Sequence, residues 1–273
     1  MGWQVAENDS VFNGSIPEIY DEYLVPLIFE EYADDLADRI VSAEPASVLE
    51  LAAGSGVVTR ALDPRLSSSS RYMVTDLNQT MLDRASSVQP PDDRIEWRQA
   101  DALDLPFDDD SFDVVVCQFS AMFFPDKVAG YAEARRVLKP GGMFVFNVWD
   151  DIESNEFSDL VTQGAAEVFP NDPPLFLART PHGYHDLEQI RADIVAAGFS
   201  DISIETLEKV SSDPTARHPA IAYAQGTLLL NEIEERDAGA LELVTDRATE
   251  LIAARFGDGP VSAKIRGHVI VAR

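Results

Sequence analysis

The chain contains one cysteine, Cys117, only four lysines and no long apolar run among its 273 residues. A single cysteine excludes an intrachain disulfide, which suits a reducing cytoplasm. No apolar run approaches the ~18 residues that a membrane-spanning helix needs. Residues 1–18 lack both the basic and the apolar region of a secretion signal. We therefore expect a cytoplasmic protein without a membrane span.

Positive charge is also scarce, because 21 basic residues face 48 acidic ones and the formal net charge is −27. Such a surface repels phosphate backbones, so we expect no nucleic-acid partner. A neutral or cationic small molecule suits this field better. Few lysines and many acids fit a high-salt origin or an ordinary acidic protein, and composition leaves both open. The hydrophobic fraction of 45% is enough for a substantial core without disulfides.

Short apolar segments alternate with helical ones between residues 42 and 150. Because this alternation is typical of βαβ units with right-handed crossovers, it predicts an α/β fold with a Rossmann-like, doubly wound, mostly parallel sheet. The expected strands are 47–51, 72–76, 94–99, 112–118 and 143–149. The expected helices are 57–62, 79–87 and 127–138, the last stopped by Pro140-Gly141-Gly142.

The pattern loosens outside this region. We expect a single domain over residues 1–273, with 42–150 as its ligand-binding core. Three other segments are expected to form a lid and to bind a second small molecule beside the first. They are the helical segment 9–41, the proline-rich insertion 150–185, and 211–259. Further elements are expected as helices at 187–197, 219–230 and 238–256 and as strands at 202–207 and 269–271.

The strongest site signal is the run Glu50-Leu51-Ala52-Ala53-Gly54-Ser55-Gly56, which ends the first expected strand. Glycine allows close approach of the backbone to a ligand, and the following helix presents free amides. The place of this run between a strand and a helix predicts a ligand site. A tight turn without a ligand is the alternative.

Three further signals follow later strands. Asp76 comes 20 residues after Gly56, where a carboxylate accepts hydrogen bonds from ribose hydroxyls, although a helix cap is the alternative. Asp101-Ala102 follows the third strand, where Asp101 could accept from an exocyclic amine or simply be solvated. Cys117-Gln118-Phe119 ends the fourth strand. The carboxyl ends of parallel strands meet at one edge, so all four signals predict a single site there.

These residues together resemble the class I S-adenosylmethionine-dependent methyltransferases, particularly the branch of the ubiquinone/menaquinone C-methylases. The resemblance covers Val48 to Trp149. Its motifs are Val48-Leu49-Glu50-Leu51-Ala52-Ala53-Gly54-Ser55-Gly56, Thr75-Asp76, Ala100-Asp101-Ala102, Leu105-Pro106-Phe107, Ser111-Phe112-Asp113 and Arg136-Val137-Leu138-Lys139-Pro140-Gly141-Gly142.

The resemblance implies a seven-stranded sheet whose last strand is antiparallel, S-adenosyl-L-methionine as cofactor and a small-molecule methyl acceptor. It also implies the cofactor contacts, which fall in four groups. They are Glu50, Ala52, Gly54 and Gly56 at the methionine portion, Asp76 at the ribose, Leu77 with Asp101 and Ala102 around the adenine, and Cys117, Gln118 and Phe119 at the sulfonium. Ser55 and Met81 are further cofactor contacts without an assigned portion.

Methyl transfer from a sulfonium is an in-line displacement, so an acid–base group is needed only if the acceptor must lose a proton. Candidate groups are His182, His185 and Tyr20, although loop histidines are common and Tyr20 also fits a packing stripe. Cys117 is better interpreted as a packing residue than as a nucleophile. No metal site is expected, because the histidines lack suitable partners. Acceptor and oligomeric state stay open.

Two other interpretations of the sequence are possible. A nicotinamide-dependent dehydrogenase would need a third glycine where Thr59 stands, and it would give Asp101 no role. A regulatory module could bind S-adenosylmethionine without turnover, although the binding residues are intact. Binding of S-adenosylhomocysteine or NADH distinguishes the first alternative, and a turnover assay distinguishes the second.

Overall fold

The computed structural model describes residues 16–273, so the beginning of the segment predicted at 9–41 lies outside the described residues. The chain divides into two compact units. One unit contains Glu30–Val148, His185–Thr206 and His268–Arg273, and we call it the sheet unit. The other contains the chain up to Phe29, Trp149–Tyr184 and Leu207–Gly267, and we call it the helical unit.

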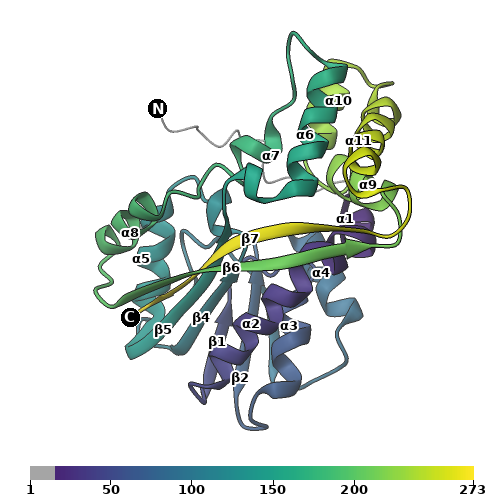
Figure 1. The fold of residues 1–273 in the computed structure, drawn as a ribbon. Coiled ribbons are helices and arrows are strands. Elements are labelled where there is room, and N and C mark those ends of the chain that lie inside the picture. The colour runs from purple at the N-terminus through teal and green to yellow at the C-terminus, as the bar shows by residue number, and fades with distance from the viewer. Residues whose placement is uncertain (1–15) are drawn as a thin grey trace. The chain divides into compact units, whose positions relative to one another are not determined.

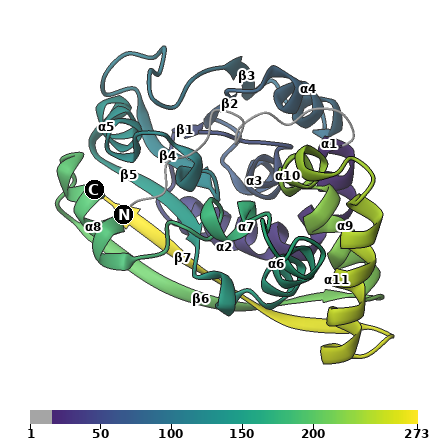
Figure 2. The same ribbon diagram turned by 90° about the horizontal axis from the view of Figure 1, so that it is seen from above.

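The sheet unit is built on a seven-stranded sheet with the order β3-β2-β1-β4-β5-β7-β6; Figure 1 labels every strand but β3, which Figure 2 shows beside β2. The pairs β1–β2, β1–β4, β2–β3 and β4–β5 are parallel, and the last strand is antiparallel. Asp201 and Arg273 exchange backbone hydrogen bonds beside β6 and β7. The predicted fold class is therefore confirmed. The strands are β1 Ser47–Glu50, β2 Arg71–Asp76, β3 Ile95–Gln99, β4 Phe112–Gln118, β5 Leu138–Trp149, β6 Ile202–Asp213 and β7 Val261–Ala272.

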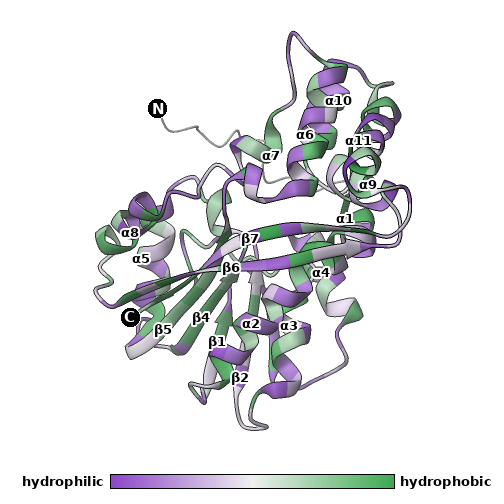
Figure 3. Cartoon of the chain, viewed as in Figure 1, coloured by the Kyte–Doolittle hydropathy of each residue, from purple (hydrophilic) through white to green (hydrophobic). Residues whose placement is uncertain are grey.

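Helices cover both faces of this sheet. Figure 2 shows α5 and α8 on one side of the central strands and α2 and α3 on the other. The central strands β1, β4 and β5 are largely apolar (Figure 3) because a sheet covered on both faces has no solvated side. Val114, Val115 and Val116 of β4 are all buried. The helical elements are α2 Glu30–Val41, α3 Val57–Leu62, η2 Asp63–Arg65, α4 Gln79–Val88, η3 Ala121–Phe123, α5 Lys127–Val137 and α8 Leu187–Ala196.

The beginning of β5 differs from the prediction. The strand begins at Leu138 rather than at Met143, so Pro140-Gly141-Gly142 lies inside β5 instead of before it. The register shifts from Phe112↔Leu138 to Val114↔Met143, which accommodates the extra residues as a bulge. Gly141 has φ +81°, a conformation that glycine adopts without a steric penalty.

The helical unit contains more helix than the sequence patterns indicated. The insertion at 150–185 forms two α-helices and a short 3-10 helix, and Gly226 divides the helix predicted at 219–230. Gly164 of α6 lies so close to α11 that an added Cβ would be 2.9 Å from the backbone nitrogen of Ala248. The elements are α1 Ile16–Ile19, η1 Tyr20–Phe29, η4 Ile152–Ser154, α6 Glu156–Val168, α7 Phe176–Arg179, α9 Arg217–Gln225, α10 Leu229–Arg236 and α11 Leu241–Phe256.

The leading segment of this unit is a π-helix over Tyr20–Phe29 rather than the regular helix expected there. Pro26 lies inside it, and proline has no N–H to donate to the helical ladder. Leu24, Leu27 and Ile28 are buried, as a packing stripe requires. No described helix of either unit is long and apolar enough to cross a membrane. The lid role of 9–41, 150–185 and 211–259 stays a prediction.

Candidate functional site

The turn after β1 has the backbone conformation that its glycines predict. Gly54 and Gly56 have φ of +57° and +80°, and Ala52 is also left-handed at +50°. A Cβ on Gly56 would lie 3.0 Å from the Cβ of Ala85, so glycine here lets α3 approach α4. Alanine rarely adopts positive φ, and such residues cluster at functional sites. The turn is thus held in a shape that the local sequence alone does not favour.

Asp76, at the end of β2, is bonded to this turn. Its Oδ2 accepts from the backbone N–H of Gly54 at 2.8 Å, and its Oδ1 accepts from that of Asn78 at 2.7 Å. Asn78 itself caps α4 by accepting from the N–H of Thr80, so Asp76 is not the helix cap. Burial raises the pKa of Asp76, while the two backbone donors oppose this rise. Each carboxylate oxygen retains a lone pair for another donor.

Glu50 is buried beneath the same turn, with 1% of its surface exposed. Its Oε2 accepts from the hydroxyl of Thr59 at 2.7 Å and from that of Tyr72. Burial raises the pKa of Glu50 to about 7, against these hydrogen bonds and the nearby charge of Arg60, which lower it. Tyr72 and Thr59 are site residues that sequence reasoning missed, because a buried strand tyrosine and a helical threonine are ordinary core residues.

The other residues around β2 and β3 form the second part of the edge. Leu77 is 53% exposed directly after β2, which is unusual for a leucine beside a buried carboxylate. Met81 is buried in α4, with its Cε 3.8 Å from where a Cβ on Gly54 would lie. Asp101 is exposed and its Oδ1 accepts from the N–H of Leu103 at 2.9 Å, while Ala102 is buried.

Two side chains of α5, Glu133 and Arg136, hold the loop after Asp101. Arg136 begins one of the sequence motifs and Glu133 lies just before it, but neither had a predicted role. Glu133 accepts from the N–H of Leu105 at 2.8 Å. Arg136 donates to the carbonyl oxygens of Leu105 and Phe107 at 2.9 and 2.8 Å. The two side chains also pair with each other at 2.7 Å. This network fixes the chain that leads from β3 to β4.

The end of β4 supplies the third part. Cys117 is fully buried, and burial raises the pKa of its thiol to about 12, so it is protonated at neutral pH. Gln118 is half-buried and pairs in the sheet with Asn147 of β5. Phe119 is buried and left-handed, with φ +45°. A protonated thiol is not a nucleophile, which supports packing as the role of Cys117.

The three candidate acid–base residues are placed differently. His182 is buried in the helical unit, where its Nδ1 lies 2.8 Å from the carbonyl oxygen of Asp150 and its Nε2 lies 3.0 Å from the hydroxyl of Ser158. The carbonyl requires Nδ1–H, so both ring nitrogens are engaged. Tyr20 is half-buried and stacks on Phe29 at 5.2 Å. His185 is exposed in the sheet unit.

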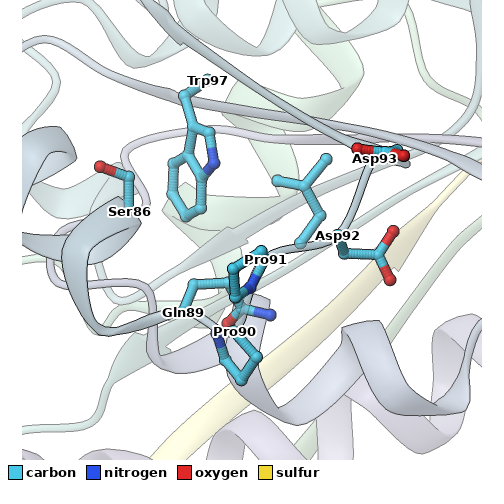
Figure 4. Close-up of a pocket in the computed structure, with 8 residues that line it drawn as sticks. Ser86, Gln89, Pro90, Pro91, Asp92, Asp93 and Trp97 are labelled. Carbon is cyan, nitrogen blue, oxygen red and sulfur yellow. The ribbon is translucent and has the colours of Figure 1, made fainter.

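A pocket of about 280 Å³ lies elsewhere in the sheet unit, between the end of α4 and β3 (Figure 4). It begins near the first residue of β3, whereas the candidate residues follow the last residues of the strands. No predicted site residue lines this pocket. The residues that line it are Ser86, Gln89, Pro90, Pro91, Asp92, Asp93, Ile95 and Trp97.

Two observations at the strand ends are compatible with a bound ligand. The hydroxyl of Ser55 is buried inside the glycine turn and has no hydrogen-bond partner among the described residues. Unsatisfied buried polar groups are rare in native proteins and require an explanation. The second observation is the exposed side chain of Leu77, which offers an apolar surface beside Asp76. An adenosyl group with ribose hydroxyls and a flat apolar base complements both.

Comparison with known proteins identifies the family. The model of a methyltransferase domain matches residues 49–146. The ubiquinone/menaquinone biosynthesis C-methyltransferase UbiE of Hahella chejuensis is 30% identical over 169 residues, which cover 56% of this chain and 67% of that protein. The demethylmenaquinone methyltransferase of Clavibacter sepedonicus is 42% identical over 98 residues, covering 36% of this chain and 39% of that protein.

Solved structures share the fold at low identity. The YcgJ protein of Bacillus subtilis has a TM-score of 0.53 with 18% identity, covering 89% of this chain and 97% of that one. The [4+2]-cyclase SpnF has a TM-score of 0.54 with 15% identity, covering 100% and 87%. One fold therefore serves different chemistries, and the sequence matches carry the assignment. The chain belongs to the class I S-adenosylmethionine-dependent methyltransferases, in the branch of the ubiquinone/menaquinone C-methyltransferases, which transfer a methyl group from S-adenosylmethionine to a small molecule.

Proposed function

We propose that this enzyme methylates a ring carbon of a reduced quinone related to demethylmenaquinone, and that the residues at the ends of β1 to β4 hold its cofactor. The sequence matches support the acceptor class, because the relatives reported above are named for ubiquinone, menaquinone and demethylmenaquinone. The observation that carries the cofactor site is the joint between Asp76 and Gly54, which ties a carboxylate to the glycine turn at 2.8 Å.

Asp76 is the residue proposed to bind the ribose. Two backbone N–H groups already orient its carboxylate, so the Asp76 side chain does not have to be immobilised when the ribose binds. The remaining lone pairs accept the two hydroxyls, which are donors of matching number. Leu77 supplies the apolar surface for the adenine, and Asp101 and Ala102 supply its edge contacts. Glu50, Ala52, Gly54, Ser55 and Gly56 surround the methionine portion, Met81 supports the turn, and Cys117, Gln118 and Phe119 face the sulfonium.

S-adenosylmethionine supplies the reactive methyl group when bound. The protein's part is to orient the acceptor carbon and to exclude water, since the displacement is in-line and the leaving group is neutral. The S–CH₃ bond breaks as the C–CH₃ bond forms, and the ring carbon then loses its proton to solvent or to a base. Burial of Cys117 and the raised pKa of its thiol argue against a role as nucleophile.

The test begins with calorimetric titration of S-adenosylhomocysteine into wild type, Asp76→Ala and Asp83→Ala. Asp83 is a matched control, because it lies exposed on α4 and bonds to Gln79. We expect binding by wild type and Asp83→Ala and weaker binding by Asp76→Ala. No heat with wild type would overturn the cofactor site.

The acceptor is tested separately. Reduced demethylmenaquinone with a short side chain is incubated with the enzyme and S-adenosylmethionine, and the product is analysed by mass spectrometry. We expect a gain of one CH₂ unit on the ring. If the protein binds S-adenosylhomocysteine but methylates only amine or hydroxyl acceptors across a panel, the quinone assignment falls and the cofactor site stands.

A further inference from the structure

The backbone at the end of β4 is strained at a large, buried residue. Phe119 has φ +45°, a region that non-glycine side chains rarely occupy. The residue is 5% exposed, and its ring meets the ring of Tyr32 edge-on, with centroids 5.0 Å apart. Such backbone conformations persist only when the surroundings over-determine them. Some neighbouring group must therefore hold Phe119 in this conformation.

Asn147 of β5 contacts the strained peptide directly. The N–H of Phe119 donates to the side-chain Oδ1 of Asn147 at 2.8 Å and also lies 3.2 Å from the carbonyl oxygen of the same residue. Asn147 is fully buried and is paired with Gln118 in the β4–β5 ladder. Because a backbone N–H must meet an acceptor, the carboxamide has its oxygen toward Phe119 and its nitrogen away from it.

This arrangement is costly for a residue with only a packing role. The Nδ2 of Asn147 is buried and has no hydrogen-bond partner among the described residues. A buried donor without an acceptor is expensive, whereas an apolar side chain of the same shape avoids that cost. Leucine would fill the same space without an orphaned group. The carboxamide is therefore explained by what its oxygen does for Phe119.

We infer that Asn147 is a positioning residue for methyl transfer. By accepting from the N–H of Phe119, it fixes the left-handed turn that presents Gln118 and Phe119 to the sulfonium. The inference rests on the proposed function, in which Cys117, Gln118 and Phe119 face that group. Asn147 acts through this backbone and not by touching the reacting atoms.

The test compares Asn147→Leu, which removes the side-chain acceptor and leaves only the longer bond to the backbone carbonyl, with Asn147→Asp, which keeps a side-chain acceptor oxygen in the same place. We expect kcat to fall at least about tenfold in Asn147→Leu while the KM for S-adenosylmethionine changes less than about threefold, since small misplacements cost rate more than binding. Asn147→Asp is expected to recover most of kcat. The amide of Phe119 should exchange its hydrogen faster in Asn147→Leu than in wild type.

A control variant separates positioning from loss of stability. Val145 lies opposite Val116 in the β4–β5 ladder, so Val145→Ala removes buried volume from the same strand and leaves the acceptor of Phe119 in place. It should lower the unfolding midpoint while leaving kcat near the wild-type value. A kcat within about threefold of wild type in Asn147→Leu, or failure of Asn147→Asp to recover activity, would overturn the inference.

Failure of the proposed function gives a different result. If wild type does not bind S-adenosylhomocysteine, the cofactor site falls, and Asn147 has no methyl transfer to position. The exchange measurement then reports only on the turn. An unchanged exchange rate for the Phe119 amide in Asn147→Leu would show that Asn147 does not hold the turn, whatever the enzyme binds.

Discussion

Replacing Glu50 with glutamine should change how the stability of this enzyme depends on pH. In the folded state burial raises the pKa of Glu50 from 4.5 to about 7, although Thr59 and Tyr72 donate to its Oε2. The unfolded chain ionises this group near its ordinary value. Between these two values the folded state holds a proton that the unfolded state has lost, so stability falls as pH rises.

The size of this effect follows from the two pKa values. The contribution of Glu50 is fully present below pH 4.5 and is lost as pH rises through about 7. A difference of about 2.5 units at about 1.4 kcal/mol per unit amounts to about 3 kcal/mol. Glutamine carries no proton to lose. The stability of Glu50→Gln relative to wild type should therefore rise by about 3 kcal/mol between pH 4.5 and pH 8.

Urea unfolding of both proteins across this pH range measures the difference. The many other carboxylates titrate equally in both proteins, so their contribution cancels. Glu133→Gln is the control, because hydrogen bonding to Arg136 lowers the pKa of Glu133. Glu133 therefore stays ionised in both states above pH 6, and its difference from wild type should be flat there. If the free energies of unfolding of wild type and Glu50→Gln change in parallel with pH, the raised pKa of Glu50 is refuted.

Three further predictions concern other positions. Asp76→Ala should weaken S-adenosylmethionine binding by about 1–3 kcal/mol, the scale of lost charge-assisted hydrogen bonds, and an unchanged dissociation constant by calorimetry would contradict this. Gly164→Ala should destabilise the protein by about 1–3 kcal/mol through overpacking, because the new Cβ would lie 2.9 Å from the nitrogen of Ala248; a urea midpoint equal to wild type would count against the close approach of α6 and α11. Cys117→Ser should keep most of the wild-type turnover, since the thiol is buried and protonated; complete loss of activity in a folded variant would reopen a role as nucleophile.

The sequence predicted the parallel core well because its signals there are local. Continuous apolar runs define β1 and β4, and Met81, Leu82 and Ala85 define the buried face of α4. The predicted bounds of β4 agree with the structure. The two long strands β6 and β7 were predicted as short ones. Most residues of β6 are half-buried or exposed, so few of them are apolar beyond Leu207 and the sequence pattern of a strand weakens there.

The site residues divide in the same way. Gly54, Asp76 and Asp101 could be proposed from the sequence because they lie at or shortly after the carboxyl ends of β1, β2 and β3. Asn147, Tyr72 and Thr59 were missed, because their importance lies in contacts with residues distant in sequence. Tyr72 bonds to Glu50 from a neighbouring strand, and Asn147 bonds to Phe119 in the same way. No local pattern distinguishes such residues from ordinary core positions.

Every residue proposed to hold the cofactor lies between Glu50 and Phe119, within the sheet unit. The hydrogen bonds around the turn also begin and end in this stretch: Asp76 accepts from the N–H of Gly54, and Glu50 accepts from the hydroxyls of Thr59 and Tyr72. Substitutions in the helical unit thus leave these bonds in place. If this unit binds the acceptor, as the sequence predicts for 150–185 and 211–259, we expect natural variation or laboratory evolution to alter it and recruit new acceptors while the residues proposed to bind the methyl donor stay unchanged.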